Sequence, residues 1–368
     1  MNYSIWETRY CQIIAVGDKE GLAILHLNTG EGKRKFEISD QWIRDDAFFS
    51  EVKSQVDEYM EGSRTAFSLK LNPRGTEYQK KVWQALSEIP YGNLVTYKEI
   101  ARAIGNEKAS RAVGMANSKN PIPILVPCHR VVGANGKLTG FAHGLRIKEE
   151  LIFHEKLMDI YKRLLDEFGP QKWWPAKTDF EMMIGAILVQ NTNWGNVVQA
   201  LANLNGQLNP QRLEQFSLEE IAEFIRPSGF YQQKAKTIKA FLRWYSGYEF
   251  QVEKVRAVDG EQVRQELLEI HGVGRETADC MLTYTFQHPS FVVDAYARRI
   301  FERVGLKIPE GYDACREKVE KAIPRELRVY NEFHALLVQL GKVNCKKRAN
   351  CEDCPIRALC SYRRETST

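Results

Sequence analysis

The hydrophobic pattern of the chain changes near residue 73, and this change restricts the possible folds more than any other feature. Before it, apolar and polar residues alternate around Tyr10–Ala15 and Leu22–Leu27, on either side of a glycine-containing loop at 17–21. This pattern predicts a β-hairpin. A helix is expected at about Phe48–Met60 and a further strand at Ala66–Leu71. The first part of the chain is therefore predicted to be a small α/β domain.

From Thr76 the apolar spacing becomes that of a helix. Thr96 is a suitable N-cap for a helix over Tyr97–Ile104, and a second helix over Ala109–Asn117 follows after four residues. Two short helices with so tight a connection predict a helix-turn-helix. Further on, Asn135-Gly136 predicts a hairpin turn.

Nearly everything after Met158 has the pattern of helices, with turn signals that include Asn209-Pro210 and Pro227-Ser228-Gly229. A helix that begins at Leu145 leads into this region, and no linker rich in proline, glycine or serine separates the two parts. We expect a short helical join near 155–160. The predicted domains are a small α/β domain (1–72), a domain with the helix-turn-helix (73–157) and an all-α domain (158–368).

Composition places the chain among globular proteins, with 43% hydrophobic and 27% charged residues. We find neither a secretory signal nor an apolar run long enough to cross a membrane, so a cytoplasmic monomer is expected. Residues 341–368 contain seven Lys or Arg against three Asp or Glu. This surplus suits either a phosphate-facing module or a solvated tail.

Cys128 lies between a proline and a histidine-arginine pair in NPIPILVPCHRVV, from Asn120 to Val132. An isolated cysteine beside a base or cation suits a nucleophilic thiolate. The alternative is a buried structural cysteine. The upstream helix has small residues around Arg111, which permit close approach to another helix or to DNA.

The segments YQKKVWQALSEIPYGNLVTYKEIA, ASRAVGMANSKNPIPILVPCHRVV and LIFHE resemble the O6-alkylguanine-DNA alkyltransferases over 76–155 and, more weakly, over 1–75, where that family has an RNase H-like α/β domain. The resemblance implies single-turnover transfer of an alkyl group to a cysteine from a flipped guanine, with no cofactor. It further implies O4-alkylthymine as a second substrate. The site residues that it implies are Cys128 as acceptor, His129 to draw off its proton, Glu155 to orient His129, Tyr97 to donate to the leaving base, Arg111 to fill the gap in the duplex and Asn120 to brace the loop.

One departure from this family is GFAHG at 140–144, where His143 replaces a small residue. A side chain there is predicted to narrow the mouth of the pocket.

In the second part, Cys345, Cys351, Cys354 and Cys360 are separated by five, two and five residues. This spacing suits zinc or an iron–sulfur cluster. Upstream, the IHGVG sequence at 270–274 lies between two helical stretches, and its Gly272 and Gly274 free backbone amides for a phosphate.

Asp294 follows this hairpin, at the end of an apolar run and the start of a helix, where an N-cap is the ordinary structural explanation. Hairpin, aspartate and cysteines in this order resemble the endonuclease III-like (HhH-GPD) DNA glycosylases over 158–368. The resemblance implies a [4Fe–4S] cluster, double-stranded DNA as the partner and Asp294 as the catalytic carboxylate. Bifunctional members have a lysine where this chain has Glu276, so a monofunctional glycosylase is expected.

The stretch KWWPAKTDFEMMIGAILVQNTNW contains Trp173, Trp174, Gln190 and Trp194. Aromatic residues at such spacing suit either a core or a base pocket. The stretch resembles the 3-methyladenine DNA glycosylases, and an indole face attracts a cationic alkylated purine by about 0.5–2 kcal/mol. Two alternatives remain: an endonuclease III-like activity on oxidised pyrimidines, and a non-catalytic DNA-binding or redox module.

Overall fold

The computed structural model describes residues 1–204 and 206–362. The chain divides into two compact units, the first comprising 1–163 with 321–324 and the second comprising 164–320 with the residues from 325 onward. Among the described residues, no helix combines the length and the apolar character needed to cross a membrane.

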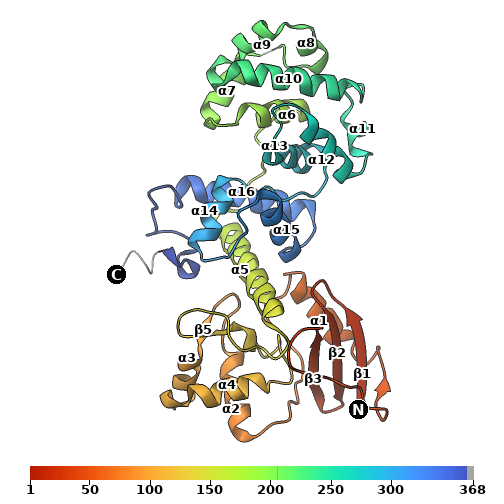
Figure 1. Cartoon of the computed structure of the whole chain (residues 1–368), viewed down its shortest axis with the longest axis vertical. Helices are drawn as coiled ribbons and strands as arrows, with labels where there is room; N and C mark the ends of the chain where they lie inside the picture. The colour runs from red at the N-terminus through yellow and green to blue at the C-terminus, as the bar shows by residue number, and fades with distance from the viewer. Residues whose placement is uncertain (205, 363–368) are drawn as a thin grey trace. The chain divides into compact units, whose positions relative to one another are not determined.

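The first unit begins with a four-stranded sheet in the order β3-β2-β1-β4 (Figure 1). Strands β1 (Asn2–Glu7), β2 (Gln12–Asp18) and β3 (Gly21–Asn28) are antiparallel neighbours, and the short β4 (Ile43–Arg44) pairs with β1 in parallel. The predicted hairpin is therefore confirmed. Helix α1 (Ser50–Met60) packs its apolar side chains into the same core as the strands, and most residues of β2 and β3 are buried.

The strand predicted at Ala66–Leu71 does not form. Only Leu71 makes a bridge, to Leu22 at the start of β3. Further along, the amide of Leu25 donates instead to the carbonyl of Pro121, at 2.9 Å. A loop from a distant part of the sequence thus takes the edge of β3 on which a longer strand would have paired.

The helix-turn-helix predicted by the sequence is present. It consists of α3 (Tyr97–Ala103) and α4 (Ser110–Ser118), with α2 (Glu77–Ser87) packed against both. Thr76 and Thr96 each accept a hydrogen bond from the third residue of the helix that follows, and each completes a capping box. These caps fix where α2 and α3 begin.

The turn at Asn135-Gly136 is present, and Gly136 has a φ of +71°, but the turn does not close a hairpin. Strand β6 (Val131–Val132) pairs in parallel with β5 (Val95–Thr96), which precedes the helix-turn-helix. Pairing with a strand that is distant in the sequence leaves the residues after the turn without a strand partner.

The helical join is longer than expected, because α5 runs without interruption over Leu145–Phe168. The boundary between the two units falls within it, between Arg163 and Leu164.

The second unit is helical, as predicted, and the described residues from 164 to 362 contain no strand. Its helices are α6 (Asp179–Leu188), α7 (Trp194–Asn203), α8 (Pro210–Gln215), α9 (Leu218–Phe224), α10 (Tyr231–Ser246), α11 (Val252–Arg256), α12 (Gly260–Glu269), α13 (Arg275–Met281), α14 (Ala295–Arg303), α15 (Tyr312–Ala322, whose last two residues belong to the first unit) and α16 (Leu327–Val343). A capping box formed by Ser217 and Glu220 opens α9.

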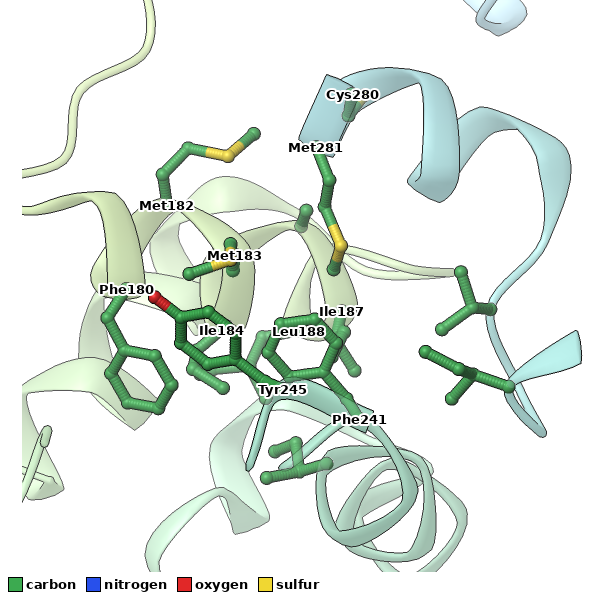
Figure 2. Packing of buried hydrophobic residues seen from close by; sticks show 14 of the residues in the cluster. Phe180, Met182, Met183, Ile184, Ile187, Leu188, Phe241, Tyr245, Cys280 and Met281 are labelled. Carbon is green, nitrogen blue, oxygen red and sulfur yellow. The ribbon is translucent and has the colours of Figure 1, made fainter. Parts of the chain in front are cut away.

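The main core of this unit surrounds α6, whose residues from Phe180 to Leu188 are nearly all buried (Figure 2). Phe241 and Tyr245 of α10 stack on each other at 5.8 Å and pack against α6. A helix that is apolar on all sides must be covered by neighbours on all sides, and α7, α10 and α13 provide that cover.

Helices α12 and α13 are joined by the hairpin at 270–274, so the predicted helix–hairpin–helix is present. Gly272 has a φ of +85°, and a Cβ atom there would lie 2.0 Å from the Oγ1 atom of Thr237. Gly274 has an ordinary φ of −91° and open space where a Cβ would be. The first glycine is therefore required by the fold, whereas the second is not.

Replacement of Gly272 by alanine is expected to lower the free energy of unfolding of the second unit by about 2 kcal/mol or more, because it adds both backbone strain and a collision. Gly274→Ala is the matched control and should change this free energy by less than about 0.5 kcal/mol. Urea unfolding followed by circular dichroism measures both variants. Equal stability of the two would contradict this view of the hairpin.

Candidate functional sites

Cys128 begins a short 3-10 helix over Cys128–Arg130 and is only 4% exposed. Its loop is held by side-chain amides. Asn120 donates from Nδ2 to the carbonyl of Val126 at 2.8 Å and accepts at Oδ1 from the amide of Ile122 at 3.1 Å. Asn117 donates to the carbonyl of Cys128 at 3.4 Å. The cysteine therefore lies at a fixed position inside the first unit.

A buried network around the carboxylate of Glu155 lies behind this cysteine. His129 Nε2 is 2.9 Å from Glu155 Oε1, and Arg130 binds both carboxylate oxygens at 2.8–2.9 Å. The hydroxyl of Tyr59 donates to Oε1 at 2.5 Å, and the amide of Gly92 donates to Oε2 at 3.2 Å. The structure thus brings Glu155 and His129 together, with an arginine as the counter-charge.

Burial opposes the charged form of Glu155, but His129 and Arg130 outweigh it and hold the pKa of Glu155 well below its usual range. Burial lowers the pKa of His129, so its imidazole is neutral. Burial also raises the pKa of Cys128, although Asn120, Lys148 and Arg34 partly offset it. Dehydration outweighs the nearby cations, so the thiol is favoured over the thiolate at rest.

Tyr97 is the first residue of α3, and its hydroxyl donates to the carbonyls of Thr139 and Gly140 at 3.3 and 3.5 Å. Burial raises the pKa of this hydroxyl, which therefore keeps its proton. A Cβ atom on Gly114 of α4 would lie 3.8 Å from the Tyr97 ring, in ordinary van der Waals contact. The two helices of the helix-turn-helix thus approach closely beside this tyrosine.

Arg111 is exposed on α4, and so is Met115 one turn later, with 70% of its surface open. Ala112 and Gly114, between them in the sequence, are small, and Val113 is buried. An exposed arginine and an exposed apolar side chain on one helix face suit contact with a DNA groove.

His143 does not lie at the mouth of a pocket. Its side chain is buried, its Nδ1 is 3.1 Å from the carbonyl of Leu27, and its ring is 5.0 Å from that of His26. Burial lowers its pKa to about 3, so it is neutral. The predicted narrowing of the pocket by His143 is therefore wrong, because the backbone at Gly144, with a φ of +103°, turns this segment toward β3.

Sequence reasoning missed Tyr59, Arg130 and Lys148 in this site. Lys148 is fully buried, and its ammonium donates to the carbonyls of Val131 at 2.6 Å and Thr139 at 2.8 Å. Burial lowers its pKa to about 8. Arg130 stands in the cysteine motif itself and could have been found, whereas Tyr59 gives no local signal because it lies 96 residues from Glu155.

Replacement of Glu155 by glutamine is expected to destabilise the first unit by about 3–5 kcal/mol at pH 7, because Arg130 loses its buried counter-charge. The pKa of Glu155 is depressed in the folded state, so its stabilising effect is complete above the unfolded value of about 4.3 and declines as the pH falls below it. The stability difference from wild type should therefore shrink below about pH 4.

Thermal unfolding from pH 3 to 8 tests this prediction. The control is Glu77→Gln, on an exposed helix face. Equal losses of stability in both variants would disprove it.

In the second unit, Asp294 caps α14, and its Oδ1 accepts from the amide of Ala297 at 2.7 Å. Its other oxygen lies 3.5 Å from Nε2 of His334. The cap predicted as a structural explanation is therefore real, and it leaves one carboxylate oxygen directed elsewhere.

Glu276 lies in the first turn of α13, and the residue taken as a whole is exposed to solvent. Dehydration of its carboxyl group and the nearby charge of Asp294 raise its pKa to about 7, although His334 acts in the opposite direction. The carboxyl groups of Glu276 and Asp294 thus influence each other. Glu276 stands at the position where bifunctional glycosylases have a lysine.

The indoles of Trp174 and Trp194 meet edge to face at 5.4 Å, and Trp173 contacts Trp174 at 5.5 Å. All three are partly exposed. The ammonium of Lys342 lies 4.7 Å from the centre of the Trp173 ring. Gln190 makes a structural contact, because its amide donates to Thr277 Oγ1 at 2.9 Å and to the carbonyl of Gly272 at 3.1 Å.

The four C-terminal cysteines line one cavity, together with Ile300, Arg303, Val304 and Ile356. Arg303 donates to the sulfur of Cys345 at 3.3 Å, and the sulfur of Cys360 lies 3.3 Å from the Arg303 carbonyl. Within 1–204 and 206–362, no three His, Cys, Asp or Glu side chains converge closely enough to hold a single metal ion. Part of the basic surplus predicted at 341–368 lies outside the described residues, at 363–368.

Sequence reasoning also missed Phe230, which begins the turn before α10. It is 69% exposed and has a left-handed backbone with a φ of 47°. An exposed aromatic residue held in such a conformation is a candidate for contact with a ligand.

Comparison with known families divides the chain between residues 157 and 184, the region that also contains the boundary between the two units. The 6-O-methylguanine DNA methyltransferase models match residues 1–73 for the ribonuclease-like domain and 77–157 for the DNA binding domain. The model of the HhH-GPD superfamily base excision DNA repair protein matches 184–325.

Individual relatives support this division. The methylated-DNA–protein-cysteine methyltransferase of Methanosarcina acetivorans is 55% identical over 152 residues, which are 41% of this chain and 96% of the relative. A protein of Methanocaldococcus jannaschii named "Putative DNA repair glycosylase" is 42% identical over 211 residues, which are 56% of this chain and 96% of the relative.

A solved structure agrees with the fold of the second unit. A trapped endonuclease III–DNA covalent intermediate is 22% identical, with a TM-score of 0.52, and the match covers 58% of this chain and 99% of that one. The chain therefore belongs to the methylated-DNA–protein-cysteine methyltransferases through its first part and to the HhH-GPD base excision DNA repair superfamily through its second.

Proposed function

We propose that this chain repairs alkylated DNA with two separate active sites. The first transfers an alkyl group from O6 of guanine, and also from O4 of thymine, to Cys128. The observation that supports this most directly is the buried arrangement of His129 and Glu155 directly behind the cysteine.

The tautomer of His129 follows from its partner. A carboxylate only accepts hydrogen bonds, so the Nε2 atom that faces Glu155 bears the proton. Nδ1 then has a free lone pair, and it has no hydrogen-bond partner among the described residues. In this state His129 can accept the proton of the Cys128 thiol through a water molecule.

The transfer step then balances. The sulfur of Cys128 attacks the alkyl carbon, a C–S bond forms, and the bond from that carbon to O6 breaks with its electron pair on guanine. The thiol proton passes to His129. Tyr97 supplies a proton to the guanine ring, so guanine leaves as a neutral base, and Tyr97 then regains a proton from solvent. The thioether has no route back to a thiol, so each molecule acts once.

The helix-turn-helix would present this site to double-stranded DNA. O6 of a stacked guanine is out of reach, so the nucleotide must be flipped out of the duplex. The exposed Arg111 on α4 is placed to occupy the gap, and the small residues beside it permit the helix to approach the groove closely.

The second site would hydrolyse the glycosidic bond of alkylated purines such as 3-methyladenine. Asp294 would stabilise the positive sugar that forms when the base leaves, and water would then add to C1′. The Lys342 ammonium over Trp173 supports this substrate class only in that it is an example of a cation attracted to an indole of this group, as a positively charged base would be. Glu276 offers no amine for an imine with the sugar, so no strand cleavage is proposed.

For the cysteine cavity we propose a [4Fe–4S] cluster with a structural role. In such a cluster each thiolate binds a different iron, so the four sulfurs surround a larger object than one zinc ion. Four cysteines line one cavity, and among the described residues no three of them converge as ligands of a single metal ion would. This arrangement suits a [4Fe–4S] cluster better than one zinc ion. The ligands would be Cys345, Cys351, Cys354 and Cys360.

The two activities should separate by mutation. Cys128→Ala is expected to abolish methyl transfer from O6-methylguanine duplexes and to leave release of 3-methyladenine intact, since it removes only the acceptor. Asp294→Asn should reduce base release by at least about 100-fold while methyl transfer continues. Asparagine also caps helices, so this variant keeps α14. Undiminished base release by Asp294→Asn, or wild-type release only from thymine glycol duplexes, would rule out the proposed glycosylase.

The cluster predicts a visible colour. Purified protein should show a broad absorption near about 400 nm, as expected of thiolate-bound iron–sulfur clusters. Cys354→Ser should remove it, whereas Cys11→Ser, in the first unit, should retain it. A colourless wild-type protein with one bound zinc ion would contradict the proposal.

A further inference from the structure

Tyr284 and His334 form a hydrogen-bonded pair beside Asp294. No sequence motif predicted this pair. Tyr284 belongs to a π-helical turn, η4 (Leu282–Phe286), and His334 belongs to α16. The Tyr284 hydroxyl lies 2.5 Å from His334 Nδ1, and His334 Nε2 lies 3.5 Å from Asp294 Oδ2. Isolated π-turns inside helices occur frequently at functional sites.

The direction of these contacts can be worked out from the chemistry of the groups. Nε2 of His334 is buried and has no hydrogen-bond partner within the described residues, yet it lies next to a carboxylate oxygen. A lone pair there would repel the carboxylate, so Nε2 bears a proton. In neutral His334, Nδ1 then accepts from the Tyr284 hydroxyl. This hydroxyl also lies 3.3 Å from the carbonyl of Asn331, which would accept its proton if His334 were doubly protonated.

Tyr284 also contacts the tryptophan group. Its ring lies 5.5 Å from that of Trp174, which in turn packs against Trp194. A continuous path of contacts therefore leads from the proposed base pocket through Tyr284 and His334 to the carboxylate of Asp294.

We propose that His334, held by Tyr284, is a positioning residue that fixes and stabilises the ionised carboxylate of Asp294. This inference rests on the proposed role of Asp294 in base release. The amide of Ala297 holds Oδ1, and the Nε2–H of His334 approaches Oδ2, so the two donors together define the plane of the carboxylate. Closure of the 3.5 Å gap as positive charge develops on the sugar would strengthen this support at the moment it is needed.

Other charged or titratable groups also act on these three residues. Glu276 and Cys280 of α13 interact with the charge of Asp294, and so does Lys342 of α16. Glu332 of α16 acts on Tyr284. Glu276 bears a charge of the same sign as Asp294, whereas His334 offers Oδ2 of Asp294 an N–H donor, so loss of His334 removes a favourable contact to that oxygen.

The test compares His334→Ala, His334→Gln and Tyr284→Phe in the full chain loaded with its cluster. Glutamine can place an N–H near the position of Nε2, and phenylalanine retains the ring against Trp174. We expect His334→Ala to lower single-turnover release of 3-methyladenine by about 10- to 100-fold, the range for loss of one hydrogen bond to a charged group. His334→Gln should recover most of this loss, and Tyr284→Phe should be intermediate.

The pH profile separates positioning from general structural damage. The acid limb of the base-release profile should move to higher pH in His334→Ala and return toward wild type in His334→Gln. His288→Gln, a histidine of the same unit, is the control and should leave both rate and profile unchanged. Equal defects in the alanine and glutamine variants, with an unshifted acid limb, would overturn the proposal.

A direct spectroscopic measurement keeps this inference distinct from the proposed function. In histidine-labelled protein, NMR should show His334 protonated at Nε2, and Asp294→Asn should shift its ring signals while those of His288 stay in place. If wild-type protein released no base, the glycosylase proposal would fail, but this shift would still establish the His334–Asp294 contact. An unchanged His334 signal would refute the contact itself.

Discussion

The buried charge of Glu155 is the interaction on which the first active site depends. Removal of a carboxylate from water costs several kcal/mol, so it must be met by well-placed donors. Those donors come from separate parts of the sequence: Tyr59 from α1, Gly92 from the turn after α2, and His129 and Arg130 from the cysteine loop. Satisfaction of this one charge therefore joins the sheet domain to the loop that bears Cys128, the proposed nucleophile.

The same network explains why the cysteine is protected while at rest. Arg130 neutralises Glu155, so the carboxylate can orient His129 but has little tendency to take its proton. The imidazole stays neutral and is free to act as a base at Nδ1. A buried thiol next to a neutral base is unreactive until a substrate is in place, which suits the proposed single transfer to Cys128.

Features set by neighbouring residues could be predicted from the sequence, and features set by distant ones could not. The cap at Thr96 was predicted because it needs only the next three residues. The strand at Ala66–Leu71 failed because a loop at Pro121 takes the strand edge.

The orientation of individual side chains also could not be predicted from the sequence. His143 occupies the expected place in the chain, but it turns toward β3. The hydrogen bond from Gln190 to the carbonyl of Gly272 in the hairpin could not be predicted either. Tyr59 and His334 were missed because their partners lie 96 and 40 residues away.

The replacement of a lysine by Glu276 connects the electrostatics of the second site with its proposed substrate. A lysine at this position would add a second positive charge, besides that of Lys342, near Asp294 and would further oppose the entry of a cationic base. Glu276 instead has a pKa of about 7, because of dehydration and the charge of Asp294, so at neutral pH it is divided between neutral and negative forms. The site also contains Trp173, an indole whose face attracts a cation. An alkylated purine that is already positive gains from this field before its bond breaks, whereas a neutral oxidised pyrimidine gains only as charge develops on the sugar.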